Sequence, residues 1–482
     1  MSRLTKNPSF ILFIIFLEGF VSISTEILTI RQLIPVAGTS IIVTSLIIGI
    51  FLLFLAIGYW RGGLYRENFT AILRRNFIIA SGLMGIGIAY PFIAFFFIVT
   101  EQYIPNSNLL FALTIYLILI IAPIIYLIGQ TVPLTMNLMD PKKRTAEIGG
   151  NALFISTLGS FLGALLTSLL LMEFLGVAWT VFINFLILTT LVLCFSKNKE
   201  WLRYALLAGI MGLVVYRLNI SFEKNHFITT TNYANYNVIK NIESDLRSTG
   251  KILVANNSLS SFIGDDKKTF PYIELIKRIL FKDLALHDAQ ILVLGAGGFT
   301  LSASETHDNH FTYVDIDPKI KSIVEKNFLA KINGDFVAQD ARVYLVNHIQ
   351  QYDAIISDTY SNARSIPPAL LTHEYFSSIK HALKPNGFAI FNIIAKPFLN
   401  DAYSKRADST IRTVFGNCLA SPLTYADNLT NIIYVCHPSQ NAQDKMVYTD
   451  NHNTADLDFI FLRKESYSDH LLVGFYQKTA GL

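Results

Sequence analysis

The chain is poor in charge and in cysteine, and its first 220 residues contain no histidine. Charged residues make up only 15% of the 482 residues, whereas hydrophobic residues make up 52%. This balance excludes an ordinary soluble protein of this length. Three cysteines are too few for a disulfide framework and their spacing matches no zinc motif, so we expect no metal site. Cys418 and Cys436 could still form a single bridge.

The charges that are present divide unevenly along the chain. Residues 1–220 contain 14 Lys and Arg against 8 Asp and Glu, whereas residues 221–482 contain 25 against 27 and all ten histidines. The small net charge of +4 lies near apolar segments, which argues against a nucleic-acid partner. We therefore predict a transmembrane domain at 1–220, a β-hairpin module with a lead-in helix at 221–285, and an α/β domain at 286–482.

Seven apolar runs in the first part are long enough, or nearly so, to cross a lipid bilayer. The first run is too long for a cleavable signal peptide, and Glu18 and Glu26 interrupt it. The last run is the weakest of the seven. The predicted spans are residues 10–30, 40–60, 77–99, 109–129, 150–172, 177–195 and 202–218.

Basic residues gather in alternate loops between these spans, and the opposite loops carry only Arg31. The positive-inside rule then predicts a multi-pass protein of the cell membrane with its N-terminus in the cytoplasm. Seven complete spans would place the α/β domain outside, whereas a seventh run lying in the membrane interface would not. The sequence leaves both arrangements open, and it leaves a homo-oligomer open as well.

Three charged residues, Glu18, Glu26 and Arg31, fall within or beside the first span. A charge near the bilayer centre costs roughly 3 kcal/mol on insertion scales. We expect Glu26 and Arg31 to form a structural ion pair, and the alternative is a polar path for a cationic solute. Gly159 and Gly163 form a small-xxx-small pair in the fifth span, which predicts close helix packing.

The most informative stretch of the second part begins with the apolar run at residues 291–294, which predicts a buried parallel strand. Gly295, Gly297 and Gly298 follow, then a helix-compatible segment and a second apolar run that ends in acid at Asp315. Glycines let a ligand approach the backbone closely, and an acid twenty residues after the first glycine suits ribose hydroxyls. The pattern predicts a nucleoside-binding βα unit.

Strands and helices alternate through the rest of this part. This alternation predicts a doubly wound, mainly parallel sheet of the Rossmann-like kind, preceded by a small β-hairpin module. Ligands of such sheets lie at the carboxyl ends of the strands, and Asp315, Asp340 and Asp358 all fall there.

These motifs in combination resemble the spermidine synthase family of polyamine aminopropyltransferases, and the apolar first part resembles the membrane-bound branch of that family. The segments that carry the resemblance are ILVLGAGG, VDIDP, the Asp-Ala pair at 340, YDAIISD, LLTHEYF, LKPNGF and YTDNHNTAD, with GFVSISTEILTIRQL and FLLFLAIGYWRGG in the first two spans.

The resemblance implies a transfer of an aminopropyl group from decarboxylated S-adenosylmethionine, as co-substrate, to an amine such as putrescine. It implies no prosthetic group. Asp358 would orient or deprotonate the amine, since a carboxylate attracts a polyammonium substrate and can accept its proton. The donor would lie on Gly295, Gly297, Asp315, Asp340 and Ala341, and the acceptor near Asn237, Tyr236, Tyr272, Glu274 and Tyr360.

The chain also departs from the family pattern. Gly298 and Ser361 stand where the family usually carries acids, and Arg364 in the same loop as Ser361 would repel a polycation. Two other functions therefore stay open. One is a methyltransferase that uses intact S-adenosylmethionine, and the other is a membrane transporter or sensor that binds a nucleoside or polyamine without turnover.

Overall fold

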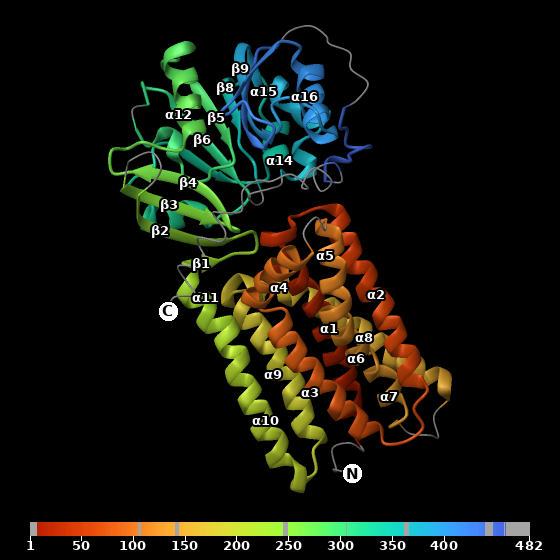
Figure 1. The fold of residues 1–482 in the computed structure, drawn as a ribbon. Coiled ribbons are helices and arrows are strands. Elements are labelled where there is room, and N and C mark those ends of the chain that lie inside the picture. Colours follow the sequence, from red (N-terminus) through yellow and green to blue (C-terminus); the bar gives the residue numbers. More distant parts are fainter. Residues whose placement is uncertain are drawn as a thin grey trace. The chain divides into compact units, whose positions relative to one another are not determined.

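The computed structural model describes residues 7–104, 108–139, 144–243, 249–304, 306–360, 366–438, 447–456 and 458. Contacts divide the chain into two units, one formed by residues 1–37 and 41–232 and the other by residues 38–40 and 233–482. The first unit is helical and the second is an α/β unit (Figure 1).

Helices make up almost all of the first unit. Seven of its described helical segments are long and apolar enough to cross a membrane: Pro8–Ala37, Ile41–Gly63, Phe69–Gly87, Leu109–Met136, Thr145–Leu175, Val177–Phe195 and Glu200–His226. The elements are α1 (Pro8–Ala37), α2 (Ile41–Gly63), α3 (Phe69–Gly87), α4 (Tyr90–Tyr103), α5 (Leu109–Tyr116), η2 (Leu117–Ile121), α6 (Ala122–Gly129), α7 (Thr131–Met136), α8 (Thr145–Leu166), η3 (Thr167–Leu175), α9 (Val177–Phe195), α10 (Asn198–Tyr216), η4 (Arg217–Ser221), α11 (Phe222–His226) and the short strand β1 (Thr229–Thr230).

The third predicted span is wrong in its bounds. The apolar run at 77–99 is interrupted after Gly87, and α4 starts anew with Pro91 in its first turn. Proline fits the first turn of a helix but breaks a helix interior, because it lacks the N–H donor. The seventh segment, in contrast, is continuous over 27 residues rather than weak, which is ample length for a span.

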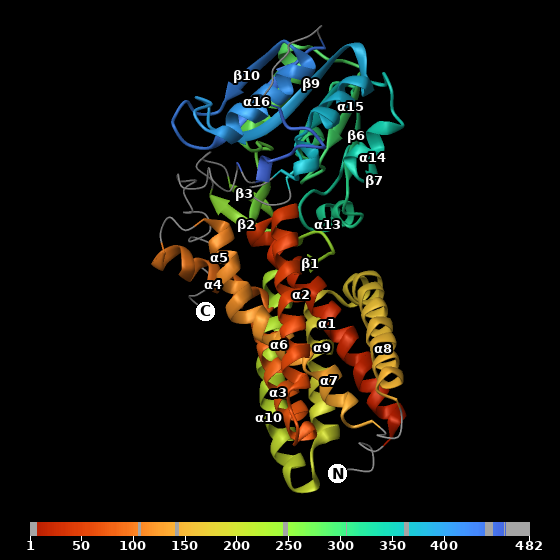
Figure 2. The same cartoon turned by 90° about the vertical axis from the view of Figure 1, so that its right-hand side faces the viewer.

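Small residues let two helices of this unit pack at backbone distance, as the Gly159–Gly163 spacing predicted. A Cβ on Gly159 would lie 2.1 Å from the Phe16 carbonyl oxygen, and one on Gly163 would lie 2.6 Å from that of Phe20. Only glycine allows so close a contact between α8 and α1, which lie side by side in Figure 2.

The α/β unit starts with an antiparallel sheet of β2 (Asn235–Glu243), β3 (Thr249–Ala255) and β4 (Ser258–Gly264), so the expected hairpin module has a third strand. A seven-stranded sheet follows in the order β10-β11-β9-β8-β5-β6-β7. Its parallel part is β9 to β7, and β10 and β11 are antiparallel. The elements are α12 (Pro271–Arg278), η5 (Ile279–Asp283), β5 (Gln290–Leu294), η6 (Thr300–Ser302), β6 (His310–Asp315), α13 (Ile320–Asn327), β7 (Asp335–Ala338), α14 (Ala341–Val346), β8 (Tyr352–Ser357), η7 (Pro368–Leu370), α15 (His373–Ala382), β9 (Leu383–Ala395), α16 (Ala402–Phe415), β10 (Cys418–Pro422) and β11 (Thr430–Cys436).

The two faces of this sheet bury separate apolar cores. Leu292 and Leu294 of β5 pack with α14, α15 and α16, whereas Ile291 and Val293 pack with α12, α13 and the first sheet. Successive side chains of a strand point to opposite faces, so a continuous apolar run is what a strand covered on both sides requires. The fold is therefore the doubly wound, mainly parallel arrangement that the sequence predicts.

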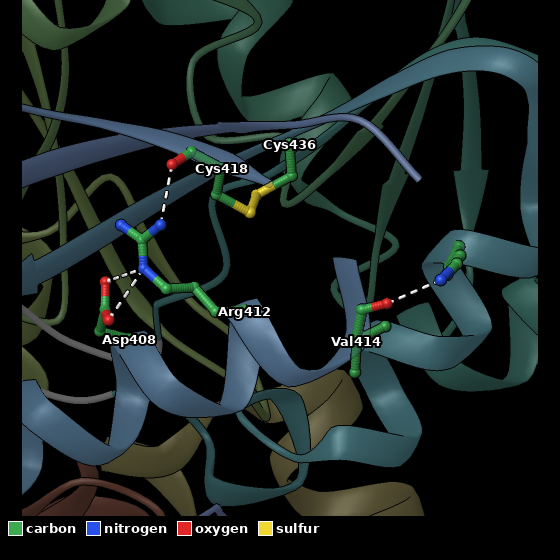
Figure 3. Close-up of a disulfide and its surroundings, with 6 residues drawn as sticks. Asp408, Arg412, Val414, Cys418 and Cys436 are labelled. Atoms are coloured by element: carbon green, nitrogen blue, oxygen red, sulfur yellow. Dashed lines mark hydrogen bonds and ion pairs between the residues drawn. A yellow bond between two sulfur atoms is a disulfide. The ribbon is translucent and has the colours of Figure 1, made fainter. Parts of the chain in front are cut away.

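A disulfide joins the two antiparallel strands at the edge of this sheet. Cys418 of β10 and Cys436 of β11 face each other in register, with their Cα atoms 4.2 Å apart. Arg412 of α16 donates to the Cys418 carbonyl oxygen at 2.9 Å and to the Asp408 carboxylate at 2.9 Å (Figure 3). The edge strand is thus fixed both to its neighbour and to the helix that covers it.

Candidate active site

The glycine turn after β5, Asp315 of β6 and Asp358 after β8 lie beside one another at the same end of the sheet. Leu294, the last residue of β5, is in register with Val314 of β6 on one side and Ser357 of β8 on the other. Gly295 therefore starts its turn between Asp315 and Asp358, as expected for the carboxyl edge of a parallel sheet.

The glycine turn packs directly against the backbone at the end of strand β8. Gly295 has φ 90°, and a Cβ there would lie 2.3 Å from the Asp358 carbonyl oxygen. Gly297 has φ 48°. Both backbones adopt the left-handed region that favours glycine, and Gly295 lets β8 approach.

The helix expected after this turn does not form. Between β5 and β6 the described residues contain only the 3-10 turn η6, and His307 and Asp308 have positive φ values. A left-handed backbone ends a helix, and the segment that remains is too short for another. A helix N-terminus is consequently missing from this side of the site among the described residues.

Ser261 of β4 completes the turn, although it was not among the predicted site residues. The Gly298 N–H donates to the Ser261 Oγ at 2.8 Å. A Cβ on Gly298 would lie 2.6 Å from both the Ser261 Cβ and the Phe328 ring. The acid that the family usually carries at this position would therefore have no room. The serine pair in SLSSF was the one sequence signal, and nothing local to it indicated the glycine turn.

Asp315 is held by backbone N–H groups. Its Oδ2 accepts from Ala296 N at 3.0 Å, and its Oδ1 accepts from Asp317 N at 3.0 Å. Burial raises the pKa of this carboxyl, although these bonds favour the charged form. Each oxygen has a second lone pair, so the carboxylate can hold the turn and still accept from ribose hydroxyls.

A buried acid beside Asp315 connects the two sheets of the unit. Asp317 is almost fully buried, and its Oδ2 accepts from the Tyr236 hydroxyl at 2.9 Å. Its Oδ1 accepts from Lys319 N at 2.9 Å. Tyr236, predicted as an acceptor contact, is thus committed to a bond between β2 and the end of β6.

Asp340 caps a helix. Its Oδ1 accepts from Arg342 N at 2.8 Å and Val343 N at 3.2 Å, and Ala341 is buried behind it in the first turn of α14. An N-cap acid leaves its second oxygen for a ligand. The Arg342 guanidinium makes a bidentate ion pair with Asp450, which belongs to the YTDNHNTAD segment.

Asp358 has a different environment, formed by side chains. Its Oδ1 accepts from Asn392 Nδ2 at 2.8 Å, and it also accepts a hydrogen bond from the Tyr272 hydroxyl. Burial raises the pKa of this half-buried carboxyl above its usual value, and the two bonds offset part of the rise. Burial and the nearby Asp358 charge raise the pKa of Tyr272 well above its usual value, so Tyr272 stays a donor.

Two further side chains, Asn431 on the antiparallel strand β11 and Tyr360 after the parallel strand β8, fix this arrangement. Asn431 of β11 donates through Nδ2 to the Asn392 Oδ1 at 2.9 Å, which leaves the Asn392 amide nitrogen to face Asp358. The Tyr360 hydroxyl donates to the Asn392 carbonyl oxygen at 3.1 Å and accepts from Ile394 N at 2.8 Å. Tyr360 is therefore anchored to β9, and Asn392 and Asn431 are site residues that the sequence did not indicate.

The remaining predicted residues have local partners. Glu274 accepts at Oε1 from Thr269 N at 2.9 Å and pairs with Lys277 at 3.3 Å. Burial would raise the pKa of Glu274, but the Thr269 and Lys277 contacts outweigh it and lower the pKa. The Asn237 Oδ1 accepts from Val238 N at 2.8 Å. Ser361 and Arg364 lie outside the described residues, and within the described ones no group of three His, Cys, Asp or Glu could hold a metal.

One known family model matches part of the α/β unit. Residues 270–445 match the family model of the spermine/spermidine synthase domain. This confirms the resemblance for those residues, and the helical N-terminal region is consistent with the membrane-bound branch. A search of curated proteins found no match.

Similar solved structures include a probable spermidine synthase from Corynebacterium glutamicum, at 18% identity and TM-score 0.37 over 44% of this chain and 80% of that chain. The spermidine synthase from Thermotoga maritima matches at 15% identity and TM-score 0.34 over 49% and 84%. Human methyltransferase-like protein 13, in complex with SAH, matches at 17% identity and TM-score 0.28 over 42% and 92%.

Proposed function

We propose that this chain, which carries a spermine/spermidine synthase domain at residues 270–445, is a membrane-anchored transferase that moves an aminopropyl group from decarboxylated S-adenosylmethionine to a small amine. The amine nitrogen would form a bond to the aminopropyl carbon while the carbon–sulfur bond breaks. The sulfur keeps the electron pair and leaves as the neutral thioether, and the nitrogen loses one proton.

The geometry of Asp358 is the observation that carries this proposal. The carboxylate lies at the end of β8, next to the glycine turn where the nucleoside would bind, and Asn392 and Tyr272 hold it. Burial raises its pKa, which makes it a better proton acceptor than an exposed aspartate. It can hold the amine in line with the donor carbon and receive the proton.

The test is product formation by the purified full-length protein, measured by mass spectrometry with decarboxylated S-adenosylmethionine and a panel of amines including putrescine. Thermal shift with methylthioadenosine checks nucleoside binding separately, since a ligand of the folded state raises apparent stability. Binding without product for every amine would overturn the transferase proposal. Methyl transfer from intact S-adenosylmethionine would instead support a methyltransferase.

A second candidate is a sensor or transporter that binds a nucleoside or polyamine without turnover. It is favoured by Gly298, where Ser261 and Phe328 fill the space that the family's acid would take. The site therefore has one carboxylate fewer for a cationic group. Donor binding that is not followed by reaction would support this candidate.

We propose further that the N-terminus is cytoplasmic and that the α/β unit lies on the other side of the cell membrane. Seven spans place the chain ends on opposite sides, and basic residues concentrate on the N-terminal side. The Cys418–Cys436 disulfide supports this orientation, because structural disulfides persist in oxidising compartments.

The orientation is tested in intact cells with a membrane-impermeant maleimide. We expect labelling of Cys418, the more exposed of the two cysteines, only after an impermeant reductant is added outside. Labelling that requires lysis would place the unit in the cytoplasm.

A further inference from the structure

Helix α1 carries a buried polar stripe through an otherwise apolar unit. The stripe residues are four and three apart, so they share one helix face. Each is at most 4% exposed: Glu18, Ser22, Thr25, Thr29 and Gln32.

The hydroxyls in the middle of the stripe are satisfied by their own helix. Thr25 donates to the Val21 carbonyl oxygen at 2.6 Å, and Thr29 donates to the Thr25 carbonyl oxygen at 2.7 Å. A carboxyl group cannot be satisfied in this way, because a carboxylate is only an acceptor and the helix N–H groups are already bonded. Glu18 therefore depends on other helices.

Among the described residues, those helices give Glu18 one hydrogen-bond donor. Ser156 of α8 donates to the Glu18 Oε2 at 2.9 Å, and Tyr59 of α2 is hydrogen-bonded to the same serine. The Glu18 Oε1 is fully buried and has no hydrogen-bond partner among the described residues. A Cβ on Gly19 would lie 2.1 Å from the Ser156 carbonyl oxygen, so the contact has little spare room.

Basic groups do not compensate this carboxyl. Within the described part of the chain no Lys, Arg or His forms an ion pair with Glu18. Arg31 follows thirteen residues later, roughly 20 Å along the helix axis. Its Nε donates to the Thr231 carbonyl oxygen at 2.8 Å, and its charge acts on Glu223 instead of on Glu26, the partner that the sequence suggested.

We propose that Glu18, with Ser156 and Tyr59, is a proton-binding site of the helical unit, independent of the site in the α/β unit. Burial in an apolar bundle disfavours an unpaired carboxylate far more than a protonated carboxyl. The tight α1–α8 contact favours a proton over any larger cation. One proton binds at Oε1 and is released again. The helical unit is then more than an anchor.

The experiment uses the purified full-length protein in lipid vesicles, titrated from low to high pH. Infrared spectroscopy should show a protonated-carboxyl band that disappears over the same range and is absent from Glu18→Gln. This variant keeps an acceptor for Ser156, and size-exclusion chromatography checks its folding.

Tyr59→Phe removes one hydroxyl of the network and keeps the ring. It should move the pH at which the band disappears without abolishing the band. A band that is absent from the wild-type protein, or one that is unchanged across the whole pH range, would overturn the proposal and leave a purely structural carboxyl.

Discussion

The carboxyl ends of β6 and β8 each present an aspartate beside the same glycine turn, yet the two are built differently. Both Asp315 oxygens accept from backbone N–H groups that shape the turn. Asp358 accepts from the side chains of Asn392 and Tyr272. A hydroxyl partner can rotate to accept a hydrogen bond, whereas a backbone N–H cannot. The comparison indicates that Asp315 is part of the architecture and that Asp358 is free to serve chemistry.

The largest expected effect comes from Asp358→Asn. The amide keeps the size of the side chain and its bond from Asn392, and Tyr272 can turn to accept from the new NH₂ group. We expect thermal stability to be retained and turnover to fall by about 10²- to 10⁴-fold, the usual contribution of a general base. Mass-spectrometric product assays and thermal melts measure the two separately. Full activity in this variant would remove Asp358 from the chemistry.

The second-largest expected effect is a loss of thermal stability in Asp315→Asn. Asp315→Asn places an NH₂ group against a backbone N–H of Ala296 or Asp317, so one buried donor loses its acceptor. We expect a loss of about 1–3 kcal/mol together with weaker binding of methylthioadenosine. Thermal melts and calorimetric titration measure the two effects. Asp335→Asn, at an exposed position of β7, is the control. If Asp315→Asn is as stable as the control Asp335→Asn, then Asp315 does not hold the turn, and the distinction drawn between Asp315 and Asp358 is wrong.

The Asp358 environment can be tested by pH. Because the carboxylate is the active form and burial raises its pKa, the rate should fall as pH decreases through that raised value. Asn392→Leu removes a donor that favours the charged form, so the acid limb should move to higher pH while the plateau rate changes little. A rate profile for each variant checks this. An unmoved limb would mean that Asn392 only packs.

The smallest expected effect is a loss of stability when the hydrogen bond between Ser261 and the glycine turn is removed. Ser261→Ala leaves the Gly298 N–H without its acceptor and should lower stability by about 1 kcal/mol. Ser258→Ala on the same strand is the matched control, and thermal melts compare them. If the two variants melt alike, Ser261 does not hold the turn.

Local pattern was sufficient for much of the fold. The apolar run of β5 predicted a strand covered on both faces, and β5 does pack on both faces. The glycine positions predicted a tight turn, and Gly295 and Gly297 have positive φ values. Local pattern failed where a segment could form either a helix or a turn, as after Gly298, because helix propensity is a weak preference that the surrounding structure overrides.

The sequence by itself determined which residues end the parallel strands, because strand direction and side-chain alternation are local properties. It also determined that seven apolar segments of membrane-spanning length are present among the described residues, because length and composition are enough for this, although the bounds of the third were wrong. Only the tertiary structure decided the partners of the acids. Asn392 and Asn431 lie 34 and 73 positions after Asp358, and Ser261 lies 37 positions before Gly298. Hydrogen bonds act over about 3 Å in space, so such partners are set by sheet order and register, which no local stretch of sequence encodes.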